Sequence, residues 1–435
     1  MTADYRSTVF LPKAESFPMR AKLPQREPET LRKWDEMDLF GKIRVASEGR
    51  ERFVLHDGPP YANGHLHMGH ALNKILKDVI NRGMQMLGYD AHYVPGWDCH
   101  GLPIEWKVEE SYRKQGQNKD DIPVGEFRRE CRAFADYWIG QQIAEFKRLG
   151  VLGNWDKPYT TMAYHAEARI VREVGAFLMN GGLYSGWRPV LWSVAEKTAL
   201  ADAEVEYYDH TSPTIWVRFP VVTPAIPALN GASVVIWTTT PWTIPGNRAV
   251  AADPDSRYSV IEVTDPGDNT LAQQGEKLAV GSDLLDQVVK ETLIADYRLI
   301  AEVSGADLAG TVCAHPFRGQ GYDFDVPVLH ANFVTMEQGT GFVHIAPGHG
   351  TDDWLLGKEK GLEIPHTLDA EGRFVEGVPL FAGAVVYKPN GKQGDANPRV
   401  MDALTESKAL LQHGKLRHSY PHSWRSKVPL IYRNT

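Results

Sequence analysis

The sequence predicts an α/β protein in which a parallel sheet is joined to a separate, mainly β domain. Three features lead to this prediction. A strand, a helix and a second strand follow one another between residues 52 and 95, a spacing typical of a β-α-β unit with parallel strands. Residues 125–187 are mostly helical in pattern. From residue 214 to about residue 386, short β-rich runs alternate with Gly and Pro.

The first part of the chain contains the elements expected to form the parallel sheet. After an N-terminal extension, residues 1–50, we expect a buried strand at residues 52–57, a helix at residues 71–87 and a second strand at residues 92–95. One face of the helix is apolar and carries Leu72, Ile75, Leu76, Val79 and Ile80. Because ligands bind beyond the carboxyl ends of parallel strands, a site is expected after each of the two strands.

The second part of the chain is organised as an insertion and a return. Strands are expected at residues 215–219 and 233–237, and residues 416–420 form a strand that leads back towards the first domain. We therefore expect four parts along the chain. These are the extension at 1–50, an α/β domain at 51–200, an inserted β domain at 201–395 and a return segment at 396–435.

Composition excludes several classes of protein. A chain of 435 residues with 43% hydrophobic and 23% charged residues is typical of a globular protein with two or three domains. No apolar run approaches the roughly 20 residues of a membrane helix, and the first residues lack a secretory signal. Cys99, Cys131 and Cys313 are too scattered for a disulfide framework or a metal site, so we expect a reducing, cytoplasmic location. The net charge of −8 neither supports nor excludes binding to nucleic acid.

The turn His67-Met68-Gly69-His70 is the first candidate site. It lies between the expected strand and the N-terminus of the expected helix, where backbone N–H groups and the helix dipole attract an anion. Imidazoles at such a position can donate hydrogen bonds to phosphate oxygens. The turn therefore predicts a site that holds ATP by its phosphates without a P-loop. The alternative is a Gly turn in which two histidines only cap the helix.

The residues on both sides of this turn resemble a known family. They are Asp57-Gly58-Pro59-Pro60-Tyr61-Ala62-Asn63-Gly64 and Pro95-Gly96-Trp97-Asp98-Cys99-His100-Gly101-Leu102-Pro103-Ile104-Glu105. Together with the turn they resemble the class I aminoacyl-tRNA synthetases, and within these the isoleucyl-tRNA synthetases. The valyl and leucyl relatives share the turn but differ in the two flanking blocks. The resemblance runs from Phe17 to Trp424.

The resemblance implies a fold, a reaction and partners. The fold is the first half of a Rossmann-like parallel sheet with an inserted, mainly β (α+β barrel-like) editing domain. The implied reaction joins isoleucine to ATP, accompanied by Mg²⁺, and then transfers the aminoacyl group to tRNA(Ile); the family is usually monomeric. The implied catalytic and ATP-binding residues are Gly64, His67, Gly69 and His70, and the implied amino-acid-binding residues are Gly58, Pro59 and Asp98. Asp98 could instead be a loop cap.

Two further segments resemble the editing domain of the same family. They are Thr238-Thr239-Thr240-Pro241-Trp242-Thr243 and Gly339-Thr340-Gly341-Phe342-Val343-His344-Ile345-Ala346-Pro347-Gly348-His349-Gly350-Thr351-Asp352-Asp353. Taken singly, each is an ordinary turn or loop. A pocket that accepts isoleucine cannot exclude valine by bulk, so a second, hydrolytic site is needed. The resemblance implies that Asp353 holds the α-ammonium of the mischarged ester and that His344 shapes the pocket. It also implies that the hydroxyls of Thr238, Thr239 and Thr240 position the ribose and the attacking water.

The sequence departs from the family in two respects. It has no K-M-S-K-S loop, so we expect a truncated chain that cannot aminoacylate tRNA alone. Some relatives carry paired cysteines near residues 192–196, and these are replaced here, which predicts no bound zinc. Three alternative functions remain open: a free-standing hydrolase that clears mischarged tRNA, a valine-specific relative, and a non-catalytic nucleotide- or tRNA-binding module.

Overall fold

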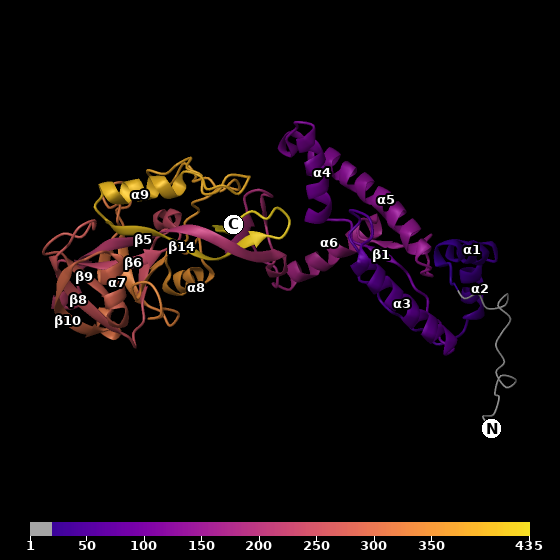
Figure 1. The fold of residues 1–435 in the computed structure, drawn as a ribbon, viewed down its shortest axis with the longest axis horizontal. Coiled ribbons are helices and arrows are strands. Elements are labelled where there is room, and N and C mark those ends of the chain that lie inside the picture. The colour runs from indigo at the N-terminus through magenta and orange to yellow at the C-terminus, as the bar shows by residue number, and fades with distance from the viewer. Residues whose placement is uncertain (1–19) are drawn as a thin grey trace, which may run out of the picture. The chain divides into compact units, whose positions relative to one another are not determined.

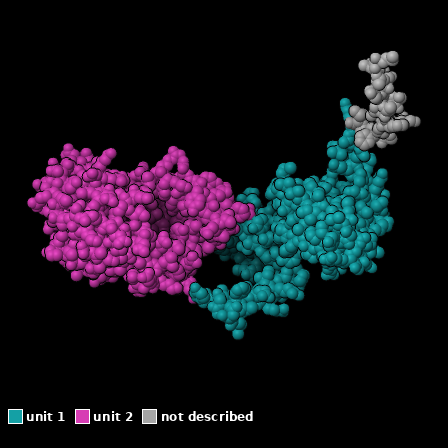
Figure 2. All heavy atoms as spheres, turned by 90° about the horizontal axis from the view of Figure 1, so that it is seen from below, with its two compact units in different colours: residues 1–184 teal, residues 185–435 magenta. Residues whose placement is uncertain are grey.

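The computed structural model describes residues 20–435, so the start of the resemblance at Phe17 lies outside the described residues. The chain divides into two compact units, residues 1–184 and residues 185–435 (Figures 1 and 2). The expected limits of the inserted domain, at residues 201 and 395, stay a prediction. None of the described helices is long and apolar enough to cross a membrane.

Unit 1 is built mainly from helices around a short parallel pair of strands (Figure 1). The helices are α1 (Leu23–Glu36), α2 (Leu39–Ala46), α3 (Met68–Met86), α4 (Leu102–Lys114), α5 (Val124–Arg148) and α6 (Tyr164–Met179). Strand β1 (Gly96–Trp97) pairs in parallel with β2 (Tyr159–Thr160). The expected helix at residues 71–87 and the helical character of residues 125–187 are confirmed.

The strands expected at residues 52–57 and 92–95 are wrong in position. Only single parallel bridges occur in this region, Arg52 with Asp90 and Tyr61 with Asp98, and the strand itself is at Gly96–Trp97. The apolar run at residues 53–55 is not buried as expected, since Val54 is 77% exposed. The parallel direction of the pairing is nevertheless as predicted, and the protein has the predicted α/β class.

The core of unit 1 includes residues of β1, α4 and α5. Its largest buried side chains are Trp97, Ile104 and Phe146, and α5 adds Ala135 and Ile139. Helix α3 does not contribute its apolar face to this core. The face exists as predicted, but its members have exposed fractions between 42 and 62%: Leu72, Ile75, Leu76, Val79 and Ile80.

Unit 2 is organised around a ten-stranded sheet, with the order β10-β8-β9-β6-β5-β11-β12-β7-β13 and β14 paired to β5. The strands are β5 (Val205–Thr223), β6 (Ala232–Thr238), β7 (Ala249–Ala252), β8 (Arg257–Asp265), β9 (Lys277–Gly281), β10 (Asp296–Ser304), β11 (Val312–Ala314), β12 (Asp325–His330), β13 (Phe342–Ile345) and β14 (Leu410–Ser423). A small sheet joins β15 (Ile431–Asn434), β3 (Pro189–Ser193) and β4 (Thr198–Ala199). The helices are α7 (Leu285–Glu291), α8 (Thr351–Lys360) and α9 (Ala396–Glu406).

The return segment of the chain is part of unit 2. The strand expected at residues 416–420 is confirmed within β14, which pairs antiparallel with β5 along most of its length, from Leu410 with Val217 to Ser423 with Val205. The expected strands at residues 215–219 and 233–237 lie in β5 and β6, and are paired with each other. Their inward side chains, including Ile215, Phe219 and Ile236, form the main core of the unit.

Candidate functional site

The two blocks that flank the histidine turn lie side by side in unit 1. Ala62 N–H donates to the carbonyl of Asp98 at 3.1 Å, and Asp98 N–H donates to the carbonyl of Pro60 at 2.9 Å. These two bonds form the parallel bridge between Tyr61 and Asp98. Segments about 40 positions apart in the sequence are thereby held in one place, so the expected amino-acid-binding residues Gly58, Pro59 and Asp98 belong to one locality.

The two histidines of the turn cap the start of α3. His67 is the N-cap residue, and its Nδ1 accepts a hydrogen bond from Gly69 N–H at 3.1 Å. His67 N–H in turn donates to Nδ1 of His70 at 3.3 Å, and the two rings stack with their centroids 3.8 Å apart. The capping interpretation is therefore correct as a description of the helix start.

Because Nδ1 of each imidazole accepts a backbone hydrogen bond, the role of the other ring nitrogen, Nε2, is determined. Because Nδ1 accepts from the backbone in both rings, the neutral tautomer carries its proton on Nε2, which is then a donor. Burial, together with the nearby charges of His67 and Lys74, lowers the pKa of His70 and favours this neutral form. The helix start therefore offers imidazole N–H donors beside a helix N-terminus, which is an arrangement suited to an anion.

The loop before α3 is held from α5 by two residues that the sequence did not single out. Gln142, which is fully buried, donates to the carbonyls of Gly64 at 2.7 Å and Tyr61 at 3.1 Å, and accepts from Trp97 Nε1 at 2.8 Å. Glu145 Oε2 accepts from Leu66 N–H at 2.9 Å. The only signal in the sequence was the presence of polar residues inside an amphipathic helix pattern, which did not reveal these partners.

Asp98 is half-buried and partly engaged in its own loop. Its Oδ1 accepts from His100 N–H at 3.4 Å and from Thr161 Oγ1 at 3.5 Å. Both distances are long, so these bonds are weak. A pocket of about 510 Å³ opens next to this loop and is lined by Cys99, His100 and Gly101, with Glu105 of α4 and Arg132 of α5.

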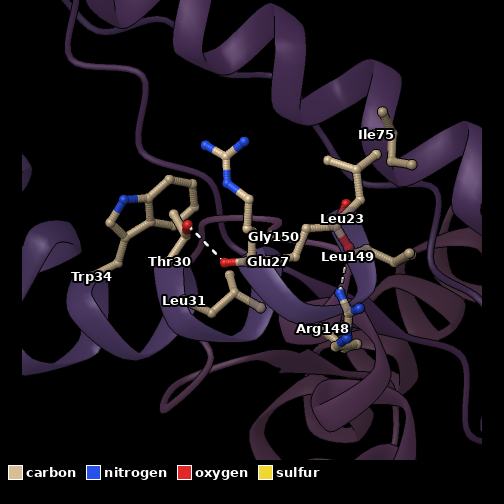
Figure 3. A pocket seen from close by; sticks show the side chains of 10 residues that line it. Leu23, Glu27, Thr30, Leu31, Trp34, Ile75, Arg148, Leu149 and Gly150 are labelled. Carbon is tan, nitrogen blue, oxygen red and sulfur yellow. Dashed lines mark hydrogen bonds and ion pairs between the residues drawn. The ribbon is translucent and has the colours of Figure 1, made fainter. Parts of the chain in front are cut away.

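A second pocket of unit 1 lies away from the predicted residues. It has a volume of about 430 Å³ and is lined by side chains of α1, with Ile75 of α3 and Leu149 beyond α5 (Figure 3). Arg148 and Glu27, which both line this pocket, form an ion pair at 2.9 Å. None of the predicted site residues lines this pocket, so we assign it no part in the candidate site.

In unit 2 the threonines form a hydrogen-bonded turn at the end of β6. Thr240 N–H donates to Thr238 Oγ1 at 3.2 Å, and the hydroxyls of Thr238 and Thr240 lie 3.1 Å apart. The chain then enters a 3-10 segment, Pro241–Gly246, in which Thr243 Oγ1 donates to the carbonyl of Thr240 at 2.8 Å. Thr239, between the first two, is half-buried.

His344, on β13, forms a hydrogen bond with this segment. Its Nε2 lies 2.8 Å from Thr243 Oγ1, and its Nδ1 accepts from Asn247 Nδ2 at 3.3 Å. Because Thr243 uses its own proton on the carbonyl of Thr240, Nε2 of His344 is the donor to Thr243. Burial, with a contribution from His349, lowers the pKa of His344 to about 3, so the ring is neutral. Thr243 and Asn247 also belong to this hydrogen-bonded group, and the sequence did not reveal their roles.

Asp353 lies in the first turn of α8 and is tied to the segment that follows β13. Its Oδ2 accepts from Ala346 N–H at 2.7 Å. Burial, and then the charge of Asp352, raise the pKa of Asp353 to about 6, whereas Asp352 is exposed. The Thr turn, His344 and Asp353 are thus connected through β13, and the structure places all the predicted editing residues in unit 2.

In the segment where some relatives carry paired cysteines, this chain has a buried carboxylate, Glu196. Glu196 Oε1 accepts from Ser423 Oγ at 2.7 Å and from Ser426 N–H at 3.0 Å, and Glu196 N–H donates to Ser193 Oγ at 3.3 Å. Among the residues that the structure describes, no group of three or more His, Cys, Asp or Glu side chains is placed to hold a metal ion.

Comparison with known proteins identifies a family for most of the chain. A family model described as tRNA synthetases class I (I, L, M and V) matches residues 29–413. The isoleucine–tRNA ligase of Bradyrhizobium diazoefficiens is 53% identical over 448 residues, which cover 99% of this chain and 45% of the relative. That of Gluconobacter oxydans is 52% identical over 444 residues, with coverages of 99% and 45%. The chain therefore spans about half the length of the curated relatives it matches.

Among solved structures, a LeuRS–tRNA–LeuAMS complex from Agrobacterium radiobacter matches 95% of this chain and 49% of its own chain. The sequence identity is 18% and the TM-score is 0.36.

Proposed function

Because the chain belongs to the class I tRNA synthetases of the isoleucine, leucine, methionine and valine group, we propose that it carries two sites of an isoleucine–tRNA ligase. Unit 1 would hold ATP and isoleucine for activation, and unit 2 would hydrolyse mischarged Val-tRNA(Ile). The complete protein would bind tRNA(Ile), isoleucine, ATP and Mg²⁺. A monomeric state and a cytoplasmic location are part of this proposal.

For activation, the isoleucine carboxylate attacks the α-phosphorus of ATP and pyrophosphate leaves. Such a reaction depends on positioning and on stabilisation of the charge that builds up on the phosphoryl oxygens. The Nε2–H groups of His67 and His70 would donate to phosphate oxygens, while Gly69 and Gly64 leave room for the nucleotide. Asp98 would pair with the α-ammonium of isoleucine, and Gly58 and Pro59 would line its side chain.

The observation that carries this proposal is the backbone bridge between Tyr61 and Asp98. It holds the acidic residue of one block beside the loop that enters the histidine-capped helix. A carboxylate for the ammonium and N–H donors for the phosphates are the two complementary groups that a zwitterionic amino acid and ATP need. Neither block would supply both by itself.

For editing, water attacks the ester carbonyl that joins valine to the terminal ribose of tRNA. The products are valine and free tRNA, so no further reactant is needed. The carboxylate of Asp353 would hold the α-ammonium of the ester. The hydroxyls of Thr238, Thr239 and Thr240 would position the ribose and the water, with His344 and Thr243 keeping the turn in place.

The test is deacylation of Val-tRNA(Ile) by this chain, beside an Asp353→Ala variant. We expect hydrolysis by the unchanged chain and a loss of roughly 10–100-fold in the variant, which is the effect of removing one charge-assisted bond. Asp352→Ala is the matched control, because Asp352 is the adjacent, exposed acid. Absence of hydrolysis by the folded chain, or an equal loss in both variants, would contradict the editing part of the proposal.

A free-standing hydrolase for mischarged tRNA is a second candidate, because all the predicted editing residues lie within unit 2. The two candidates differ in unit 1. Binding of an isoleucyl sulfamoyl adenosine, a stable analogue of the adenylate, favours the ligase. Hydrolysis without such binding favours the hydrolase. Tighter binding of the valyl analogue than of the isoleucyl one would indicate a valine-specific relative.

A further inference from the structure

Asp57 is a buried carboxylate that contacts two different elements of unit 1. Its Oδ1 accepts from Lys77 Nζ at 2.9 Å, and its Oδ2 forms a short ion pair with Lys74; both lysines belong to α3. The same Oδ2 accepts from the backbone N–H of Gly96, the first residue of β1, at 2.9 Å. Only 3% of the Asp57 side chain is exposed.

The buried surroundings of Asp57 are unfavourable to charged groups. Lys74 is buried, and its Nζ also lies 5.4 Å from the ring centre of Phe146 and 5.8 Å from that of Tyr93. Burial opposes ionisation of Asp57, but the two lysines and Gly96 N–H outweigh it and lower the pKa of the carboxyl. A charge buried in this way is maintained only while its partners keep their geometry.

The elements that Asp57 joins carry the three parts of the proposed activation site. Helix α3 has His67 as its N-cap and His70 in its first turn, and β1 runs directly into Asp98. The residues that follow Asp57 are Gly58 and Pro59, which are proposed to line the amino-acid pocket. At Gly96 the packing is close, since a Cβ there would lie 3.1 Å from the Tyr159 side chain and 3.4 Å from Pro59 Cβ.

We propose that Asp57 is a positioning residue for amino-acid activation, because it holds the histidine-capped helix and the Asp98 loop at a fixed separation through Lys74, Lys77 and Gly96 N–H. The inference rests on the proposed function of unit 1. Asp57 does not touch the substrates. It acts by fixing the distance between the phosphate donors on α3 and the carboxylate that receives the α-ammonium.

A purely stabilising role is a poorer account of the same contacts. A buried ion pair contributes little net stability compared with apolar side chains of similar volume, so stability alone does not account for this arrangement. Here one carboxylate is shared by two cations and one backbone N–H from separate elements, an arrangement that fixes their relative positions. An apolar cluster would fill the same volume without fixing the position of Gly96 N–H.

The experiment compares the unchanged chain with Asp57→Asn and with Asp78→Asn. Asp78 is a matched control, because it is a half-buried acid of α3 that bonds Arg82 and Leu152 N–H but does not contact β1.

Three quantities are measured: the Kd of isoleucyl sulfamoyl adenosine, hydrogen exchange at the Gly96 amide, and deacylation of Val-tRNA(Ile) by unit 2. We expect Asp57→Asn to weaken analogue binding by roughly tenfold or more, the scale of one weakened bond to a charged group, and to speed exchange at Gly96. Asp78→Asn should change neither, and deacylation should be unchanged in both.

A double variant separates positioning from stability. Asp57→Leu with Lys74→Met replaces the buried charges by apolar side chains of similar size, so the melting temperature should fall less than in Asp57→Leu alone, which leaves the Lys74 ammonium buried without its partner. Analogue binding should remain weakened, because Gly96 N–H has lost its acceptor. Recovery of full affinity in this double variant would overturn the inference.

The outcomes also distinguish the inference from the proposed function. If the unchanged chain binds the analogue and Asp57→Asn binds equally well, the inference is wrong and the proposed function stands. If Asp78→Asn weakens binding as much as Asp57→Asn does, the inference is also wrong. If the unchanged chain does not bind the analogue, the proposed site in unit 1 is wrong, and with it a role of Asp57 in activation.

Discussion

The ionisation of Asp353 makes the stability of unit 2 depend on pH. Its pKa in the folded protein is about 6, above the ordinary value of 3.8, so the folded state binds this proton more tightly than the unfolded state. The resulting contribution to stability is complete below the ordinary value and is lost as the pH rises through about 6. At neutral pH the folded protein therefore holds a carboxylate whose ionisation costs it stability, which is typical of a functional residue.

Asp353→Asn is expected to reduce deacylation, as Asp353→Ala does, while raising the melting temperature at pH 7. Asparagine cannot ionise, and its Oδ1 can still accept from Ala346 N–H. The increase in melting temperature should disappear below about pH 4, where the aspartate is protonated in both states. Thermal melts at pH 4 and pH 7 check this, with Asp352→Asn as the control. A melting temperature that falls at pH 7 would contradict the prediction.

A substitution can separate the roles of the two ring nitrogens of His67. Asparagine places an acceptor where Nδ1 lies and is a good N-cap residue, so His67→Asn should leave the thermal stability of unit 1 unchanged. It lacks the donor at the Nε2 position, and binding of an isoleucyl sulfamoyl adenosine or of ATP should weaken by roughly tenfold or more, as for a lost bond to a charged group. His67→Ala should reduce both stability and binding. If His67→Asn binds as tightly as the unchanged chain, Nε2 does not contact the ligand.

At the scale of elements, Glu196 connects segments that are far apart in the chain. It joins the turn between β3 and β4 to the turn that follows β14. Glu196→Ala leaves the hydroxyl of Ser423 and the N–H of Ser426 without this acceptor, and should lower the free energy of unfolding of unit 2 by about 1–3 kcal/mol. Urea denaturation measures this loss. Glu204→Ala is the control, because the carboxylate of Glu204 accepts from the nearby Ala201 N–H at an exposed position. A loss equal to that of Glu196→Ala would contradict the prediction.

The element scale also shows what could be predicted from the sequence. Helix α3 was expected because apolar residues recur at helical spacing, and β5, β6 and β14 because short β-rich runs were separated by Gly and Pro. Periodicity does not reveal which side of a helix is covered, and in α3 Lys74 is buried while Leu72 is exposed. The bonds of Gln142 to Gly64 and of Glu196 to Ser423 cross 78 and 227 positions, and no local pattern specifies such partners.

For the whole molecule, each unit has a core of its own. Trp97, Ile104 and Phe146 belong to one core and Ile215 and Phe219 to another, so we expect two separate unfolding transitions. Differential scanning calorimetry should resolve them, and Glu196→Ala should shift only the transition of unit 2. A single transition that moves as a whole would show that the units unfold together.

The exposed apolar face of α3 is expected to affect association between molecules. Leu72, Leu76 and Val79 lie on this face with exposed fractions above half, and contiguous apolar surface of this kind promotes association. Leu76→Glu introduces a charge on this face at a residue that is 54% exposed, so it should reduce concentration-dependent light scattering without lowering either melting temperature. Asn73→Glu is the matched control, since it adds the same charge to an exposed polar position of the same helix. If both variants reduce scattering equally, net charge rather than this face governs association. If neither does, the face does not mediate it.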